Sequence, residues 1–165
     1  FRRVLFRSGG ELQIRTPTIM SGYLDAPELT AAAFDDGWFR TGDLARERAP
    51  GVVELVGRAK EIISRGGSKV APLEVEYLLA GHPAVAQVLV TGVPDARLGE
   101  TIQALVVLRD GTQASAEELR AWAAARAERH KLPDAIHFGR ELPLGRTGKA
   151  DRGRLRALIA EGAFR

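Results

Sequence analysis

Two long apolar segments in the second half of the chain dictate its architecture. They read AVAQVLVTGV (84–93) and ETIQALVVL (100–108), and the loop PDARLG separates them. Aliphatic and β-branched residues in runs of this length are typical of strands buried in a sheet. We also expect a short strand at HFGREL (137–142) and a tight hairpin at EIISRGGSKV (61–70), where a Gly-Gly pair allows positive φ.

Helical patterns alternate with these strands, and each carries its own start or stop signal. Pro72 suits the first turn of a helix that Gly81 ends. Ser115 and Glu118 have the spacing of a capping box, and Asp151 can cap a last helix. The helices are expected at PLEVEYLLAG (72–81), SAEELRAWAAARAERH (115–130) and DRGRLRALIA (151–160).

The element order predicts an α+β fold for residues 60–165, a small domain in which helices pack on a mainly antiparallel sheet. Before it, residues 9–59 contain an expected strand at ELQIRTP (11–17), a short helix at PELTAAAF (27–34) and two strands around Ala49-Pro50-Gly51. A segment of about 50 residues cannot bury a core of its own. We therefore interpret residues 9–59 as the β-rich tail of a truncated larger domain.

The first eight residues, FRRVLFRS, resemble the translation of a common DNA-sequencing adaptor and are interpreted as a non-native leader. They hold three of the 24 lysine and arginine residues and none of the 21 acids. The rest of the chain therefore has no net charge, although the whole chain carries +3. A neutral chain lacks the electrostatic footprint of a nucleic-acid-binding protein, so no nucleic-acid partner is expected.

Metal, disulfide and membrane functions are not expected either. The chain has no cysteine, which excludes disulfides and thiolate metal sites and fits a cytoplasmic location. Its three histidines, His82, His130 and His137, are scattered without the spacing of metal ligands. No apolar run approaches the roughly 20 residues of a membrane span, so no transmembrane segment is predicted.

Lysine is rare in this sequence, which takes most of its positive charge from arginine. There are 20 arginines but only four lysines, Lys60, Lys69, Lys131 and Lys149. Lysine is a compact charge on a flexible stem, whereas arginine is a broad planar fork. A site that needs one mobile charge beside a reacting phosphate would select lysine, and Lys149 in PLGRTGKADR (143–152) is the candidate.

Three clusters resemble, in type, order and spacing, the C-terminal motifs of adenylate-forming enzymes. This family comprises acyl-CoA synthetases, the adenylation domains of peptide synthetases, and luciferases. GEL (10–12) and GYLDAPELTAAAF (22–34) match the segment that leads into these motifs. The clusters are GWFRTGDL (37–44), GRAKEIISRGGSKVAPLEVE (57–76) and LPLGRTGKADR (142–152).

The resemblance implies an ATP-dependent acyl-CoA synthetase. Such an enzyme joins a small carboxylic acid to the α-phosphate of ATP, which enters with Mg²⁺, and then passes the acyl group to coenzyme A. Lys149 matches the catalytic lysine of the family, whose charge stabilises the transition state of the first step. Asp43 matches the acid that binds both ribose hydroxyls, and Arg58 matches an arginine that reaches the sugar or phosphates.

The resemblance also implies that the C-terminal domain moves between two poses. Lys60 matches the hinge, where the backbone rotates between the two half-reactions. The domain withdraws Lys149 and presents the hairpin that lines the pantetheine tunnel of coenzyme A. The tunnel residues implied by the match are Ser64, Gly66, Gly67 and Lys69.

Other parts that the family uses are expected N-terminal to residue 9, namely the phosphate loop, the acyl pocket and the adenine-contacting segment. The missing N-terminal domain is therefore the expected partner, and the chain alone should be inactive. Residues 145–150 cannot replace the phosphate loop, because Ala150 stands where a Walker motif needs Ser or Thr. Two alternatives stay open: transfer to a carrier-protein thiol, and a non-catalytic module that binds a partner. A nucleic-acid binder ranks third.

Overall fold

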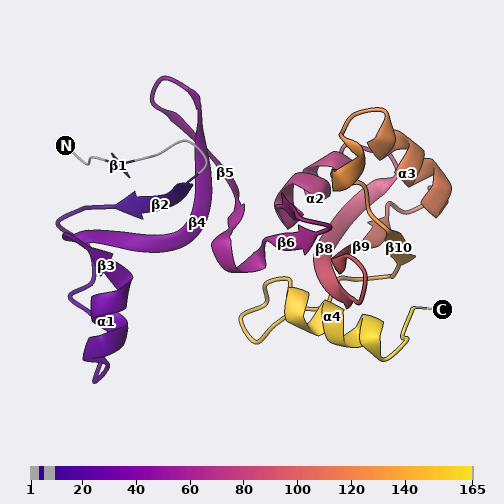
Figure 1. Ribbon diagram of the computed structural model, residues 1–165. Helices are drawn as coiled ribbons and strands as arrows, with labels where there is room; N and C mark the ends of the chain where they lie inside the picture. Colours follow the sequence, from indigo (N-terminus) through magenta and orange to yellow (C-terminus); the bar gives the residue numbers. More distant parts are fainter. Residues whose placement is uncertain (1–3, 6–9, 165) are drawn as a thin grey trace. The chain divides into compact units, whose positions relative to one another are not determined.

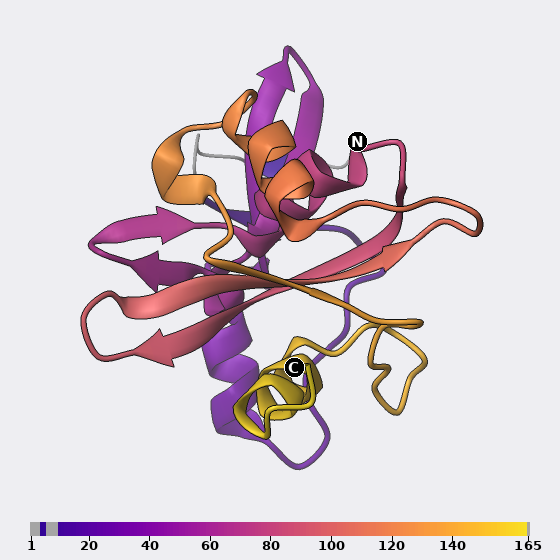
Figure 2. The same ribbon diagram turned by 90° about the vertical axis from the view of Figure 1, so that its right-hand side faces the viewer.

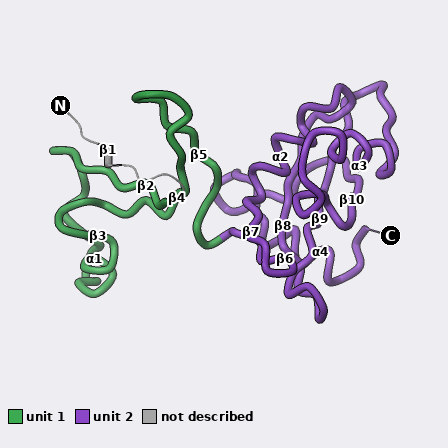
Figure 3. The backbone as a smooth tube through the Cα atoms, turned by 45° about the horizontal axis from the view of Figure 1, so that its top comes forward, with its two compact units in different colours: residues 1–60 green, residues 61–165 purple. Residues whose placement is uncertain are grey.

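The computed structural model describes residues 4–5 and 10–164, which form several strands and helices (Figure 1). The chain divides into two compact units, residues 1–60 and residues 61–165 (Figure 3). Each unit contains its own sheet of five strands. The division falls next to Lys60, the residue to which the sequence assigned a hinge.

The sheet of the first unit is organised around the long strand β4. β2 pairs along one edge of β4, and β3 and β5 share the other edge, because β2 overlaps the register of both. A tight turn with positive φ at Asp36 and Gly37 joins β3 to β4. The elements are β1 (Val4–Leu5), β2 (Gly10–Ile14), α1 (Pro27–Ala33), β3 (Phe34–Asp35), β4 (Trp38–Ala49) and β5 (Val52–Arg58).

The proposed leader falls mostly outside the described residues. Only Val4 and Leu5 are described, and they pair antiparallel with Ile14 and Gln13 of β2. The interpretation of residues 1–8 as non-native stays a prediction.

The first unit buries very little of its apolar surface. Ala45 is its only described hydrophobic residue that is buried, and α1 buries no side chain. Large apolar side chains are instead exposed on the loop before α1, on α1 and on β5, namely Tyr23, Leu24, Leu29, Val52, Val53 and Leu55. Burial of apolar surface is the main force that stabilises folded proteins, so this unit gains little stability from its own contacts.

The second unit has the predicted mainly antiparallel sheet. β8 and β9 form a long antiparallel hairpin, and β6 and β10 share the other edge of β9, with β10 parallel to it. The two apolar segments of the sequence are therefore neighbouring strands of this sheet. The strands are β6 (Ile63–Arg65), β7 (Ser68–Val70), β8 (Val85–Asp95), β9 (Gly99–Leu108) and β10 (Ala135–Phe138).

Helices cover both faces of this sheet, as Figure 2 shows. Alternate residues of β8 and β9 point to opposite faces. Val90 and Val106 pack in the core beneath α2 (Pro72–Ala80) and α3 (Ala116–Ala124). Their neighbours Leu89 and Leu105 pack on the other face against Leu155 of α4 (Arg152–Ala160). The α+β fold class is confirmed, with helices on two sides of the sheet.

Several element boundaries differ from the prediction, among them those of β2, which spans Gly10–Ile14 instead of 11–17, and of β10, which ends at Phe138 instead of residue 142. α3 ends at Ala124 instead of reaching residue 130, and beyond it the N–H of Arg126 bonds the carbonyl oxygen of Ala123, three residues back. The Arg126 guanidinium lies over the Trp122 ring and donates to the Trp122 carbonyl oxygen. A separate 3-10 turn, Arg129–Lys131, follows. β10 begins at Ala135, two residues earlier than expected, because the backbone N–H of Asp134 already bonds the carbonyl oxygen of Ile102.

Asp134 fixes the edge of the sheet, and its replacement by asparagine should destabilise the chain. The carboxylate accepts hydrogen bonds from Arg65 at 2.8 and 2.5 Å and from the N–H of Ile102 at 2.8 Å. Hydrogen bonds to charged groups contribute roughly 1.5–3 kcal/mol, so Asp134→Asn should lower the free energy of unfolding by about 2 kcal/mol at pH 7. Urea denaturation measures this loss, and Asp110→Asn, at an exposed carboxylate, is the matched control.

The effect should also depend on pH. Burial alone would raise the pKa of Asp134, but the Arg65 and Ile102 hydrogen bonds and the charges of Arg65 and Arg120 outweigh it and lower the pKa below its usual 3.8. The unfolded state therefore binds the proton first as the pH falls. The difference in stability between the original chain and Asp134→Asn should be complete above about pH 5 and should shrink as the pH falls below 3.8. An unchanged difference at pH 3 would contradict this assignment.

Candidate functional site

A bulge in β4 presents the carboxylate of Asp43. Glu11 of β2 pairs with Leu44 and Gln13 pairs with Arg40, so three residues of β4 face one residue of β2. Gly42, in the middle of the bulge, has φ +74°, a conformation that favours glycine. The TGD motif is therefore a built turn within a strand, which sets the direction of the acid that follows the glycine.

Three hydrogen bonds hold the bulge in place. The Thr41 hydroxyl donates to the carbonyl oxygen of Leu12 at 2.8 Å and accepts from the N–H of Asp43 at 3.0 Å. The N–H of Gly42 donates to the Glu11 carboxylate at 2.9 Å. The threonine and the glycine of the motif thus position the third residue, Asp43.

Asp43 and Arg58 are cross-strand neighbours on β4 and β5. Arg58 Nε lies 2.9 Å from Asp43 Oδ1, and an Arg58 terminal nitrogen donates to the carbonyl oxygen of Thr41 at 3.1 Å. The side chains of Arg58 and Asp43 are 56% and 32% exposed. A carboxylate offers about four acceptor positions, so Asp43 can bind two hydroxyl groups while it keeps Arg58. The structure brings together the two residues that the sequence assigned to the nucleotide.

Lys149 stands on a tight hairpin between β10 and α4. The N–H of Asp151 donates to the carbonyl oxygen of Pro143 at 2.9 Å, and Gly145 donates to that of Lys149 at 2.8 Å. Gly148, with φ +74°, closes the turn through a bond to Gly145. The hairpin backbone is therefore held at its base and at its tip.

The ammonium group of Lys149 is free to meet a ligand. Its side chain is exposed, and no described residue forms a hydrogen bond or ion pair with it. The two other lysines of the second unit differ, because Lys131 lies 3.4 Å from Glu74 and Lys69 bonds Ser64. A flexible cation on a rigid hairpin suits a phosphate that arrives from outside the unit.

Lys60 lies in the 3-10 turn Ala59–Glu61, at the last position of the first unit. Its side chain is exposed. A backbone rotation there would change the placement of one unit relative to the other without breaking a packed core. The hinge assignment stays a prediction.

The β6–β7 hairpin gathers the residues assigned to the pantetheine tunnel. Lys69 Nζ donates to Ser64 Oγ at 2.5 Å across the hairpin. Gly66 and Gly67 form the turn with φ +54° and +85°, and the N–H of Gly66 bonds the carbonyl oxygen of Leu98 at 2.8 Å. A side chain at Gly67 would project into open space, so the bare turn leaves backbone accessible to a narrow ligand.

A buried ion pair, Glu76 with Arg152, escaped the sequence analysis. Glu76 lies on α2, one helical turn from Pro72 and Leu79, which are both buried. A charged residue on the apolar face of a helix was the available signal. Burial is the largest influence on the Glu76 carboxyl and raises its pKa, although the N–H of Val90 and Arg152 act against it.

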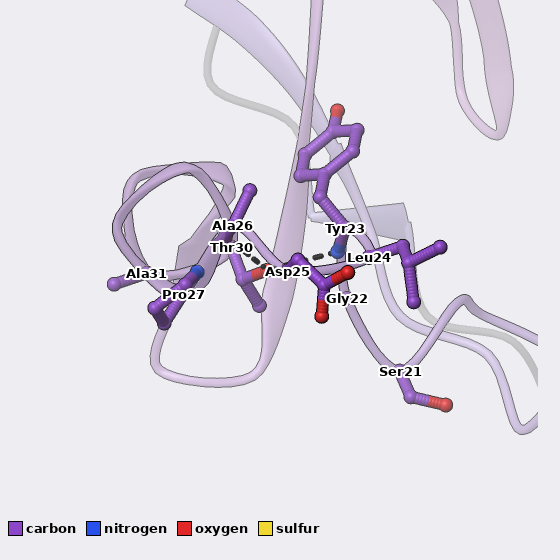
Figure 4. A pocket seen from close by; sticks show the side chains of 9 residues that line it. All are labelled: Ser21, Gly22, Tyr23, Leu24, Asp25, Ala26, Pro27, Thr30 and Ala31. Atoms are coloured by element: carbon purple, nitrogen blue, oxygen red, sulfur yellow. Dashed lines mark hydrogen bonds between the residues drawn. The ribbon is translucent and has the colours of Figure 1, made fainter.

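A pocket in the first unit lies apart from all these residues. It is formed by the loop before α1, where the Thr30 hydroxyl accepts from the N–H of Tyr23 at 2.8 Å and donates to the carbonyl oxygen of Ala26 at 3.0 Å (Figure 4). Its lining runs from Ser21 to Ala31 and includes none of the predicted site residues. The charged residue of its lining is Asp25, whose negative charge does not suit a nucleotide phosphate.

Residues 4–5 and 10–164 offer neither a metal-binding cluster nor a helix that could span a membrane. They contain no group of three or more histidine, aspartate or glutamate side chains that could hold a metal ion. Within the same residues, every helix is too short or too polar to cross a membrane.

This chain is similar to one known protein family and to individual enzymes. Residues 74–149 match the AMP-binding enzyme C-terminal domain. The chain is 43% identical over 146 residues to a long-chain-fatty-acid–CoA ligase of Bacillus subtilis and 40% identical over 143 residues to an oxalate–CoA ligase of Arabidopsis thaliana. These matches span 88% and 87% of this chain but only 26% and 28% of the relatives.

A solved structure is also similar to this chain. An amide bond synthetase from Marinactinospora thermotolerans superimposes with a TM-score of 0.88 at 36% identity, over 92% of this chain and 31% of that one. The chain thus spans less than a third of the length of each of these three proteins. The matched segments cover 87–92% of this chain, so the similarity extends over residues of both units.

Proposed function

The chain belongs to the adenylate-forming, AMP-binding enzymes through its C-terminal domain, and we propose that it is part of an acid–thiol ligase that activates a carboxylic acid with ATP. The observation that carries this proposal is the exposed Lys149 on its fixed hairpin, inside the segment that matches the family. Asp43 and Arg58, paired on the neighbouring strands β4 and β5, supply the complementary nucleotide contacts.

In the proposed first half-reaction, a carboxylate oxygen attacks the α-phosphorus of ATP. A C–O–P anhydride forms, and the bond from that phosphorus to the pyrophosphate oxygen breaks. Negative charge spreads over the phosphoryl oxygens in the transition state, and the Lys149 ammonium stabilises it. Asp43 accepts hydrogen bonds from the two ribose hydroxyls, while Arg58 holds Asp43 and adds a positive charge near the nucleotide.

In the proposed second half-reaction, a thiolate attacks the acyl carbon and AMP leaves. Coenzyme A is the proposed thiol, and the thiol proton goes to solvent. The β6–β7 hairpin lines the path of the pantetheine arm, with Ser64 and Lys69 on its strands and Gly66 and Gly67 at its turn. Rotation at Lys60 exchanges the Lys149 hairpin for this one, because the two steps need different groups at the same acyl phosphate.

We propose that the partner of this chain is a large N-terminal domain that holds ATP and the acid. The first unit supports this, because it buries only Ala45 among its described hydrophobic residues and exposes Leu24, Leu29 and Val52. Apolar side chains gathered on a unit without a core are expected to be covered by a further domain. The relatives, more than three times as long as the matched segment, have room for one.

Other components follow from the same proposal. ATP and coenzyme A are substrates, and Mg²⁺ is expected to enter with the ATP phosphates, with no described side chain of this chain assigned to it. The acid is a small carboxylate of unspecified structure. A cytoplasmic location stays a prediction, as does the absence of a nucleic-acid partner.

A chimera tests the proposal. Residues 10–165 would replace the corresponding C-terminal part of the Bacillus subtilis relative, and adenylate formation would be measured by trapping the acyl group with hydroxylamine. We expect hydroxamate from the chimera, and at least about 100-fold less from the 165-residue chain alone or from the relative without its C-terminal part. The first lacks the domain proposed to hold ATP and the acid, and the second lacks the lysine that stabilises the transition state. A folded chimera without hydroxamate above these two controls would reject the proposal.

The acyl acceptor needs its own measurement, because one similar structure is an amide bond synthetase. Three acceptors are candidates: the thiol of coenzyme A, the thiol of a carrier protein, and an amine. Lys60 at the hinge and the bare Gly66-Gly67 turn favour free coenzyme A. The chimera given each acceptor in turn should consume its adenylate fastest with coenzyme A, and a preference for another acceptor would reassign the second step.

A further inference from the structure

Arg152 joins three elements beneath the Lys149 hairpin. One of its terminal nitrogens donates to both carboxylate oxygens of Glu76 on α2, at 2.8 and 3.0 Å. The other terminal nitrogen lies 3.3 Å from the Glu61 carboxylate, next to Lys60. Glu76 in turn accepts from the N–H of Val90 on β8 at 2.8 Å. Arg152 therefore ties α4 to α2, to β8 and to the start of the second unit.

Burial of the Glu76–Arg152 ion pair costs desolvation free energy. The side chains of Glu76 and Arg152 are only 12% and 22% exposed, and Arg152 Nε is buried without a hydrogen-bond partner among the described residues. Desolvation of two charges often cancels their attraction, so that apolar residues of similar size stabilise a fold equally well. A buried ion pair with an unsatisfied donor therefore points to a geometric role, since stability alone does not account for it.

The geometry that Arg152 controls is the base of the Lys149 hairpin. Arg152 is the first residue of α4 and follows Asp151, whose N–H closes the hairpin on Pro143. Asp151 also caps the helix by accepting from the N–H of Arg154 at 3.0 Å. Any tilt of the first turn of α4 is thus carried directly into the hairpin, three residues from Lys149.

We propose that Arg152 is a positioning residue for Lys149: by binding Glu76 and Glu61 it fixes the first turn of α4 and, through Asp151, the direction of the hairpin that carries the ammonium group. Lysine could not replace it, because one ammonium cannot hold two carboxylates with the planar geometry of a guanidinium. The structural part of this proposal is independent of the reaction. Its catalytic part rests on the proposed function.

Amide hydrogen exchange in the 165-residue chain tests the structural part. In Arg152→Gln, exchange at the N–H groups of Gly145 and Asp151, which close the hairpin, should accelerate about 10-fold or more, since that is the effect of losing 1.4 kcal/mol of local stability. Exchange at Val106 in the sheet should stay within about 3-fold. Arg156→Gln is the matched control, because Arg156 lies one turn further along α4 and is 49% exposed.

Unchanged hairpin exchange in a folded Arg152→Gln chain overturns the proposal. If Arg152→Gln does not fold, hydrogen exchange is measured in Arg152→Lys, which keeps a positive charge beside Glu76. Hairpin exchange in Arg152→Lys equal to that of the original chain would also overturn the proposal. Equal acceleration in Arg156→Gln would show a general loosening of α4 and would also overturn it.

The active chimera tests the catalytic part. Arg152→Gln should lower kcat for adenylate formation about 30-fold, leave the KM for ATP within about 2-fold, and leave thioester formation from supplied adenylate unchanged, because Arg152 acts only through Lys149. Arg152→Lys should restore little of this loss. Equal losses in both half-reactions, or a rise in KM alone, would overturn the positioning role. An original chimera without activity would reject the proposed function, while the exchange measurements would still decide the structural part.

Discussion

Replacement of Lys149 by alanine should slow adenylate formation about 1,000-fold in the chimera with the Bacillus subtilis relative. Two unit charges 4 Å apart interact by about 4 kcal/mol at an effective dielectric constant of 20, and each 1.36 kcal/mol changes a rate tenfold. Thioester formation from supplied adenylate should stay within about 3-fold, because the proposed second step does not use the ammonium group. Rapid-quench assays of each half-reaction measure the two effects separately.

The controls for this prediction lie in the same domain. Lys131→Ala removes a lysine that pairs with Glu74 at 3.4 Å, and it should leave both half-reactions unchanged. Lys149→Arg keeps the charge but replaces a compact ammonium with a planar fork, and we expect it to recover only a small part of the lost rate. Equal slowing of both half-reactions by Lys149→Ala would indicate a structural role for the lysine.

Replacement of Asp43 by alanine should raise the KM for ATP and lower kcat/KM about 100-fold. The carboxylate is proposed to accept two hydrogen bonds from ribose, and loss of hydrogen bonds to a charged group costs roughly 1.5–3 kcal/mol. The fold should survive, because the Asp43–Arg58 pair is largely exposed and exposed pairs contribute about 0–1 kcal/mol. Initial rates at varied ATP concentration measure the change, and 2′,3′-dideoxy-ATP should show no further loss in the variant.

A matched control exists on the same two strands. Glu54 of β5 accepts from Arg46 of β4 at 2.8 Å, in the same cross-strand arrangement as Asp43 and Arg58. Glu54→Gln should leave kcat/KM for ATP unchanged. If Glu54→Gln lowers kcat/KM as much as Asp43→Ala does, the effect belongs to the sheet as a whole and the ribose contact is refuted.

Much of the second unit could be predicted because its local patterns agree with its packing. The apolar segments became β8 and β9 with both faces covered, since neither face carries enough charge to meet water. The capping box at Ser115 and the cap at Asp151 were confirmed, because side chains within three residues determine them. Elements whose local conformational preferences agree with their tertiary contacts can be predicted from the sequence.

Long-range contacts account for what could not be predicted. Asp134, at the start of β10, binds Arg65, which lies 69 residues earlier in the chain. Glu76 meets Arg152 across 76 residues. In each case a polar side chain finds a partner that no local pattern identifies.

For the candidate site, the motifs located the residues but not their geometry. The sequence named Asp43 and Arg58 separately, whereas the bulge at Thr41–Asp43 makes them cross-strand partners. Lys149 was named from its rarity and its motif, yet its support by Arg152 needed the structure. The residues assigned to the two half-reactions stay predictions until the measurements above are made.

The most direct test of the central claim is the chemical reactivity of Lys149 toward an amine-modifying reagent in the chimera. Residues 10–165 contain only four lysines, so mass spectrometry can follow each one. With a non-hydrolysable acyl-adenylate analogue bound, labelling of Lys149 should slow at least about 10-fold while that of Lys131 stays unchanged, because a lysine held against a phosphate is both paired and shielded. Equal labelling of Lys149 with and without the analogue would contradict the account.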